Sequence, residues 1–285
     1  MHPPLISASD LHSALHGEKP IWVFDCSNDL GHPEQGLSQF LSGHIPGAVH
    51  LHLETDLSDH EHGINGGRHP LPSRERITAF LQRLGFSSNM QAVAYDRQGG
   101  IYAGRWWWML KWCGHDAVAV LDGGWAAWQS VGGACERGAA EPGVVSEAFV
   151  LKPPLVQMLS QVEVQAQLTS PEMTLIDARG APRFRGEVEP LDPVAGHIPG
   201  ALNRPFTDNV GPDGRFKPAD QLRQEFLTLL GERSPETVVH HCGSGISALP
   251  NLLAMAIAGL GTTRLYPGSW SEWCTTEGTP RATGA

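Results

Sequence analysis

The sequence lacks any long apolar run and is short of basic residues. No apolar stretch approaches the ~18 residues that suggest a transmembrane helix. The opening MHPPLISASDLH has neither the basic region nor the apolar region of a signal peptide. Lys and Arg number 20 against 30 Asp and Glu, which gives a formal net charge of −10. We therefore expect no membrane and no nucleic-acid partner, and a small anionic substrate would need locally placed cations.

Cysteine is also scarce. The count is odd and no two cysteines lie closer than 22 residues (135 − 113), so neither a disulfide framework nor a paired-cysteine metal site is indicated. Reduced thiols and a cytoplasmic location are the expectation. Two histidines precede one cysteine, but adjacent side chains point in different directions, so we expect no metal and no cofactor. The residues concerned are Cys26, Cys113, Cys135, Cys242 and Cys274, with His240 and His241.

The 285-residue chain repeats itself. The hexapeptide GHIPGA stands at residues 43–48 and again at 196–201. An apolar run ending in Asp25 or Asp177 precedes each copy, and LDGGWAAW or YPGSWSEW follows it. The offsets are 152, 153 and 145 residues (177 − 25, 197 − 44 and 270 − 125). Three landmarks in one order at a near-constant offset predict a duplicated domain.

The repeat divides the chain into two predicted domains, residues 1–140 and 151–285. A stretch between about Cys135 and Pro154 contains ERGAAEPG and KPP, and its Pro, Gly and charged residues favour a linker. Within each copy, short runs such as AVAVL, TLIDA and TVVHHC are typical of buried strands in a parallel sheet. The chain is therefore predicted to have an α/β fold, with helices flanking each sheet.

Two helices are predicted from amphipathic patterns with end signals. SRERITAFLQRLG begins at Ser73 and ends at Gly85, and ADQLRQEFLTLLG has Asp220 as its capping residue and ends at Gly231.

Aligning the two copies sets one acidic residue against one thiol. AVAYDRQGGIYA in the first copy matches TVVHHCGSGISA in the second, so Asp96 stands opposite Cys242 at an offset of 146 (242 − 96). Such a pair suits one active copy and one that serves as scaffold.

The position of Cys242 favours reactivity. It ends a strand at the carboxyl edge of the sheet, where ligands bind in open α/β folds. Gly243 and Gly245 let the backbone N–H groups turn inward as an anion-binding nest. A helix follows, in which Pro250 must lie in the first turn. Because this setting favours the nucleophilic thiolate, we expect Cys242 to be catalytic and the other four cysteines to have packing or surface roles.

The whole chain resembles the two-domain sulfurtransferases of the rhodanese and 3-mercaptopyruvate sulfurtransferase superfamily. The resemblance is carried by the paired GHIPGA, LDGGW, the GSW–EW segment, WWWML and the loop CGSGISA. It implies two tandem rhodanese-like domains, the first inactive and the second bearing the nucleophile. The cysteine of this family accepts a sulfur atom as a persulfide and passes it to cyanide or a thiol, including thioredoxin-like proteins.

The resemblance also bears on the donor. The loop Cys242 to Ser247, with Gly243, Ser244, Gly245 and Ile246 between, matches mercaptopyruvate-type members, whereas thiosulfate-type members carry basic residues after the cysteine. Ser244 is expected to donate a hydrogen bond to the donor. Arg183 in APRFRG matches one substrate-binding arginine, and Arg185 follows it. Leu191 stands where the family's second arginine is expected, which puts the donor pocket in doubt.

The resemblance further suggests that a histidine and an acidic residue from the first domain assist the serine. Glu54 and His69 stand at the matching places, as possible auxiliary residues.

Three alternatives remain open. One is thiosulfate:cyanide sulfur transfer, and another is a non-enzymatic module that carries a persulfide to a client protein. The third is a tyrosine phosphatase, whose loop also begins His-Cys; position 248 is Ala, however, so no guanidinium would hold a phosphate there.

Overall fold

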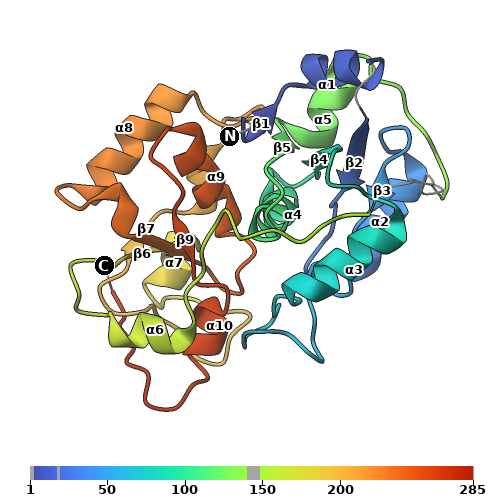
Figure 1. Cartoon of the computed structure of the whole chain (residues 1–285). Coiled ribbons are helices and arrows are strands. Elements are labelled where there is room, and N and C mark those ends of the chain that lie inside the picture. Colours follow the sequence, from blue (N-terminus) through green and yellow to red (C-terminus); the bar gives the residue numbers. More distant parts are fainter. Residues whose placement is uncertain (1–2, 18–19, 140–147, 285) are drawn as a thin grey trace. The chain divides into compact units, whose positions relative to one another are not determined.

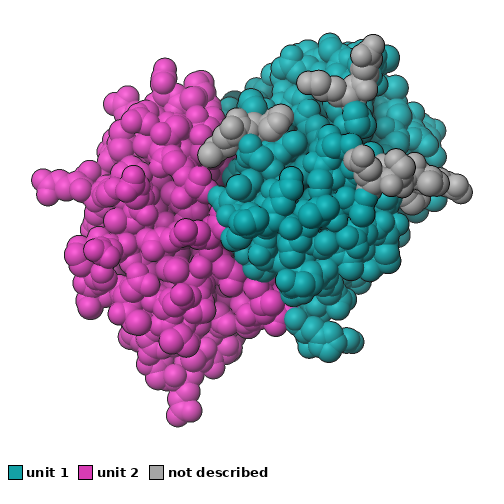
Figure 2. Space-filling model, in the orientation of Figure 1, with its two compact units in different colours: residues 1–62, 72–155, 212–216 teal, residues 63–71, 156–211, 217–285 magenta. Residues whose placement is uncertain are grey.

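The computed structural model describes residues 3–17, 20–139 and 148–284, and divides them into two compact units (Figures 1 and 2). Unit 1 comprises residues 1–62, 72–155 and 212–216, and unit 2 comprises 63–71, 156–211 and 217–285. The expected linker falls partly on residues 140–147, which lie outside the described residues. No helix in the described ranges is long and apolar enough to cross a bilayer.

Unit 1 contains a five-stranded parallel sheet in the order β1-β5-β4-β2-β3. Its strands are β1 (Leu5–Ile6), β2 (Ile21–Asp25), β3 (Val49–His50), β4 (Gln91–Tyr95) and β5 (Val118–Leu121). Its helices are α1 (Ala8–Leu15), α2 (Pro33–Ser42), α3 (Arg74–Leu84), α4 (Ile101–Trp112) and α5 (Gly124–Ser130).

Unit 2 contains a four-stranded parallel sheet in the order β7-β6-β8-β9. Its strands are β6 (Thr174–Asp177), β7 (Leu202–Asn203), β8 (Val238–His241) and β9 (Arg264–Leu265). Its helices are α6 (Gln161–Ala166), α7 (Ala181–Phe184), α8 (Ala219–Leu230), α9 (Leu249–Ile257) and α10 (Ser269–Trp273), with 3₁₀ turns at Phe206–Asn209 and Pro235–Thr237. The α/β fold with two parallel sheets is confirmed.

The two sheets repeat one topology. Strands β2, β3, β4 and β5 correspond in order and direction to β6, β7, β8 and β9. A single parallel bridge from Met158 to Leu265 stands where β1 pairs with β5. The central strands β4 and β8 each run into the loop that carries Asp96 or Cys242. The predicted site therefore lies at the carboxyl end of a strand with a neighbour on either side.

The two GHIPGA segments have the same local structure. His44 stacks on Phe40 and His197 on Phe184, with ring centroids 3.8 Å apart in both cases. Each histidine Nδ1 also lies 2.8 Å from the carbonyl oxygen of the phenylalanine on which it stacks. The sequence repeat is therefore a structural repeat down to single side chains.

Helix α3 has the predicted ends. The Ser73 hydroxyl accepts a hydrogen bond from the Arg76 amide, and Gly85 ends the helix in the left-handed conformation with φ +83°. The prediction that Asp220 caps α8 is wrong. Pro218 is the N-cap and Asp220 lies in the first turn, where a carboxylate is stabilised by the positive end of the helix dipole without capping it. Pro250 lies in the first turn of α9, as predicted.

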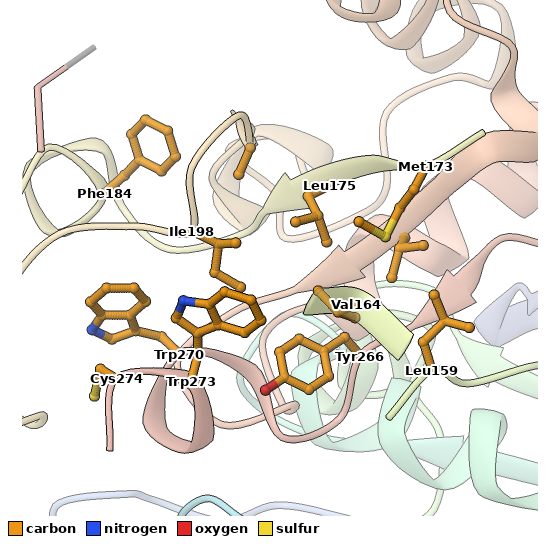
Figure 3. Close-up of a cluster of buried hydrophobic side chains, with 12 residues drawn as sticks. Leu159, Val164, Met173, Leu175, Phe184, Ile198, Tyr266, Trp270, Trp273 and Cys274 are labelled. Atoms are coloured by element: carbon orange, nitrogen blue, oxygen red, sulfur yellow. The ribbon is translucent and has the colours of Figure 1, made fainter. Parts of the chain in front are cut away.

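Each unit has its own apolar core. In unit 2 the cluster includes Tyr266, Trp270 and Trp273 of the YPGSWSEW segment, packed against residues of β6 and β8 (Figure 3). In unit 1 the equivalent LDGGWAAW segment contributes Leu121 and Trp128. The segment that follows the last strand of each sheet is therefore anchored by buried rings, and its polar backbone groups can be held in place.

Candidate active site

Cys242 directly follows β8, and the first turn of α10 holds its backbone. The Cys242 amide donates to Ser269 Oγ at 3.1 Å, and the Trp270 amide donates to the Cys242 carbonyl at 3.0 Å. The Ser271 amide donates to the Gly243 carbonyl at 2.8 Å. Cys242 itself is 1% exposed. Three consecutive residues of the YPGSWSEW segment thus fix the position of the thiol.

Ser269 is held in an unfavourable backbone conformation. Within the described ranges it is the only non-glycine residue with a positive φ, at +56°. The equivalent residue of unit 1 is Gly124, at an offset of 145 (269 − 124), with φ +54°. A glycine adopts this conformation without steric cost, whereas a serine there costs on the order of 1–3 kcal/mol. The serine hydroxyl is what binds the Cys242 amide.

The unit 1 loop shows how this strand-to-helix turn treats an anion. The Asp96 carboxylate accepts hydrogen bonds at 2.9 to 3.0 Å from the amides of Gln98, Gly100, Tyr102 and Ala103. Burial raises the pKa of the Asp96 carboxyl, and these four amides oppose that rise. The loop is a backbone nest for negative charge, and in unit 1 the protein's own carboxylate fills it.

The two loops share a left-handed glycine at one aligned position. Gly99 and Gly245, which align at the same offset of 146 (245 − 99), have φ +75° and +76°. A methyl group on Gly245 would overlap the carbonyl oxygen of Pro267, so only glycine fits. Ile246 is buried, and Ser247 is partly exposed at the end of the loop. Cys242 therefore stands at the base of a loop that shares one left-handed glycine with the loop in which Asp96 binds four amides. The loops differ beyond it, because Ile246 does not share the positive φ of the aligned Gly100.

Residues 63–71 bring two further side chains to this loop. Nδ1 of His69 lies 2.7 Å from Ser244 Oγ. The segment is attached to α10, because the Gly66 amide donates to Glu272 Oε1 at 2.6 Å and the Arg68 amide donates to Ser271 Oγ at 3.1 Å. The first copy has two alanines, in GGWAAW, where Ser271 and Glu272 stand. Only the second copy carries the side chains that bind this segment.

Two guanidinium groups lie beside Gly243. A methyl group built on Gly243 would be 3.0 Å from Nη2 of Arg68 and 3.5 Å from Nη1 of Arg183. Asp192 joins the two, with one carboxylate oxygen on Arg68 and the other 3.2 Å from Arg183. Glu189 binds Arg183 at 2.6 Å.

The carboxylates that hold these arginines differ in their electrostatic setting. Burial pushes the pKa of Glu189 upward, but hydrogen bonds from Arg183 and from two backbone amides hold it below its usual value. Burial raises the pKa of Asp192, and Arg68 opposes that rise.

Three other residues singled out in the sequence have contacts of their own. Arg185 pairs with the exposed Glu187 at 2.7 Å. Leu191 is 53% exposed, and its backbone amide donates to Glu189. Glu54 belongs to unit 1, where its carboxylate lies 2.7 Å from Nε2 of His60.

The two histidines before the thiol are core residues. Both are fully buried, and burial lowers the pKa of His240 to about 3 and also lowers that of His241. Among the described residues, no three His, Cys, Asp or Glu side chains come together as metal ligands would.

Sequence reasoning missed Arg68, Ser269, Ser271, Glu272 and the acidic pair that holds the arginines. A signal for some of them was available. The two copies differ at GGWAA against GSWSE, and polar residues that replace glycine and alanine in a repeated motif point to a role confined to one copy.

Comparison with known proteins identifies the family. The rhodanese-like domain family matches residues 7–131 and again 160–276. The chain belongs to the rhodanese family of sulfurtransferases. It is 45% identical over 281 residues to a Pseudomonas aeruginosa protein with the provisional name 3-mercaptopyruvate sulfurtransferase, covering 98% of both chains. It is 39% identical over 270 residues to SseB of Mycobacterium tuberculosis, provisionally named a thiosulfate sulfurtransferase, covering 94% of this chain and 93% of that one.

A solved structure agrees with these relatives. SseA from Escherichia coli, described with the 3-mercaptopyruvate sulfotransferases, superposes with a TM-score of 0.79 at 32% identity, covering 95% of this chain and 100% of that one. The expected family, fold and class of enzyme are confirmed: the protein is a sulfurtransferase built from two rhodanese-like domains, and it acts on small-molecule sulfur donors and acceptors.

The contribution of Ser269 to stability and to the rate of sulfur transfer can be tested by two substitutions. Ser269→Ala keeps the backbone strain and removes the acceptor of the Cys242 amide, so it should lower the free energy of unfolding by about 1–2 kcal/mol and slow sulfur transfer. Ser269→Gly also loses the hydroxyl but relieves the strain, so it should be the more stable variant while remaining slow. Urea denaturation and steady-state rates measure both effects. An alanine variant with wild-type rate would show that the hydroxyl has no part in placing the thiol.

Proposed function

We propose that this sulfurtransferase moves a sulfur atom from 3-mercaptopyruvate, through a persulfide on Cys242, to a thiol or to cyanide. The observation that carries the proposal is the position of Cys242. It occupies the base of a loop whose counterpart binds a carboxylate with four amides, and two guanidiniums lie at the next residue. In this position the backbone amides of the loop would stabilise a thiolate, and the two guanidiniums would bind an anionic donor.

The proposed chemistry conserves atoms and electrons over two displacements. The Cys242 thiolate attacks the sulfur of the donor, a new S–S bond forms, and the donor's C–S bond breaks. The electron pair of that bond leaves with carbon as the enolate of pyruvate, which takes up one proton. An acceptor thiolate or cyanide then attacks the outer sulfur and releases the Cys242 thiolate.

The neighbouring side chains take distinct roles in this proposal. Ser244 donates its hydroxyl proton to the donor's carbonyl oxygen, where negative charge grows as the enolate forms. His69, 2.7 Å from that hydroxyl, orients it. Arg183 binds the donor carboxylate. No step is assigned to Arg185 or Glu54, whose side chains pair with Glu187 and His60.

The loop composition favours mercaptopyruvate over thiosulfate. Ser244, Gly245, Ile246 and Ser247 follow Gly243 without any Lys or Arg, so the loop itself offers no cation to a dianion. Thiosulfate is the second candidate, and the paired guanidiniums beside Gly243 are the observation in its favour. We place the reaction in the cytoplasm, with a thioredoxin-like protein among its acceptors. A module that carries the persulfide without turnover is the remaining alternative.

The persulfide site can be identified by mass. After incubation with donor, one sulfur atom should be added to the peptide that contains Cys242, because the other cysteines lack the loop and its donors. Burial raises the pKa of Cys26 and raises that of Cys113 to about 12, so both serve as internal controls. Sulfur found on either control, or turnover by Cys242→Ser, would refute the assignment.

Rates measured side by side with the two sulfur donors identify the preferred one. Wild-type enzyme should show a higher kcat/KM with 3-mercaptopyruvate than with thiosulfate, using cyanide as the common acceptor. A tenfold preference for thiosulfate would make the second candidate the function. Loading of Cys242 without multiple turnovers on any small acceptor would instead support the carrier.

We propose that unit 1 takes no part in the chemistry. Asp96→Asn should keep the rate within about threefold, which is under roughly 1 kcal/mol in the barrier. It should nevertheless lower the free energy of unfolding by about 1–3 kcal/mol, because the new NH₂ group faces amide donors. Calorimetry and steady-state kinetics on one preparation separate the two effects. A several-hundredfold loss of rate in folded protein would place Asp96 in the reaction.

A further inference from the structure

We propose that Arg68, from the segment at residues 63–71, is the second cation that binds the donor carboxylate, in the place of a cation at position 191. The inference rests on the proposed function, since it names a residue that recognises the proposed donor. It predicts that specificity for an anionic donor depends on Arg68 together with Arg183.

The geometry places both arginines at one point. Nη2 of Arg68 and Nη1 of Arg183 would lie 3.0 Å and 3.5 Å from a methyl group on Gly243, the residue after the thiol. Two guanidiniums that converge on one backbone position present a fork of N–H groups to a carboxylate. Gly243 has no side chain to fill the space between them.

Acidic partners hold the two guanidiniums in place beside Gly243. Asp192 contacts Nη1 of Arg68, and Nε and Nη2 of Arg183 contact Glu189 and Asp192. The two carboxylates are buried, with side chains 2% and 4% exposed, whereas the arginines are 30% and 21% exposed. The acidic residues orient the arginines through Nη1 of Arg68 and through Nε and Nη2 of Arg183. Nη2 of Arg68 and Nη1 of Arg183, which these contacts do not use, lie beside Gly243 together with Nη2 of Arg183.

The backbone of the segment is fixed as firmly as its side chain. Gly67 has φ +89°, and a methyl group there would lie 2.6 Å from the Gly268 carbonyl oxygen and 2.7 Å from Ser271 Oγ. The next amide, that of Arg68, donates to this same Ser271 Oγ at 3.1 Å. Close approach at Gly67 therefore sets Arg68 toward Gly243 and the following residue, His69, toward Ser244. One short segment supplies both a binding group and an orienting group.

Position 191 offers no such cation. Leu191 is 53% exposed and takes part in the cluster only through its backbone amide, which donates to Glu189. A charge-assisted hydrogen bond shared by the bound substrate and the transition state affects KM more than kcat. Loss of Arg68 should accordingly raise the KM for mercaptopyruvate by roughly ten- to a hundredfold.

The experiment compares Arg68→Leu, Arg68→Lys and the double variant Arg68→Leu/Leu191→Arg with wild type. Arg76→Leu is the matched control, because Arg76 also pairs with a buried carboxylate, Asp59, at 3.1 Å. Each enzyme is assayed with 3-mercaptopyruvate and with its uncharged methyl ester, with cyanide as acceptor. The ratio of kcat/KM for acid over ester does not depend on the fraction of enzyme that is folded.

In Arg68→Leu we expect this ratio to fall at least tenfold, with kcat and the KM for cyanide within threefold of wild type. Lysine should restore part of the ratio, since it keeps the charge and loses the fork. The double variant should regain some preference for the acid, and Arg76→Leu should match wild type. An unchanged ratio in Arg68→Leu, with wild-type enzyme active on mercaptopyruvate, overturns the assignment of Arg68 alone. Wild-type enzyme that takes no sulfur from mercaptopyruvate overturns the proposed function as well.

Discussion

Each unit is organised around one arginine that binds the carboxylate at the end of a strand. In unit 1, Arg97 binds the carboxylate that ends β2 at 3.0 Å and a carbonyl at the start of GHIPGA at 2.6 Å, and its guanidinium lies 4.9 Å from the Trp125 ring centroid. In unit 2, Arg179 does the same at the end of β6, with distances of 2.7, 2.7 and 4.9 Å. The ion pair and the ring contact join a strand end, a turn and the Trp-containing segment. Asp25 and Asp177 are fully buried, so removing the arginine would leave a buried carboxylate without its cation, which is costly. The three landmarks of the sequence repeat are the three partners of this arginine.

The arginine comes from a different loop in each unit, and that difference leaves room for the site. Arg97 follows Asp96 in the loop after β4, whereas Arg179 lies in the loop after β6, where unit 1 has Ser27. Burial opposes the charge of Arg179, but its carboxylate partners outweigh burial and raise its pKa. Since Arg179 supplies the guanidinium, the residue after Cys242 can be glycine. The sequence position of Arg97 is therefore a glycine in unit 2, and the guanidiniums of Arg68 and Arg183 lie beside it.

The YPGSWSEW segment holds the thiol and residues 63–71 next to Gly243. Its tryptophans are buried, so its first helical turn is rigid, and that turn binds Cys242 through Ser269 and Trp270. The side chains of Ser271 and Glu272 bind residues 63–71. Backbone strain at Ser269 is the cost of placing a hydroxyl where the other copy has glycine. One segment therefore positions the thiol and the groups that would receive the donor.

The duplication, the α/β fold, the family and the alignment of Asp96 with Cys242 could all be predicted from the amino-acid sequence. These follow from local periodicity and from short motifs repeated at a near-constant offset, which do not depend on distant contacts. The sequence did not predict that residues 63–71 pack with unit 2 and bring Arg68 to Gly243. That outcome depends on hydrogen bonds such as that between Gly66 and Glu272, 206 residues apart, which leave no periodic trace in a single chain. The sequence also did not predict the start of α8. Pro218 is its N-cap, so Asp220 lies inside the helix and does not cap it.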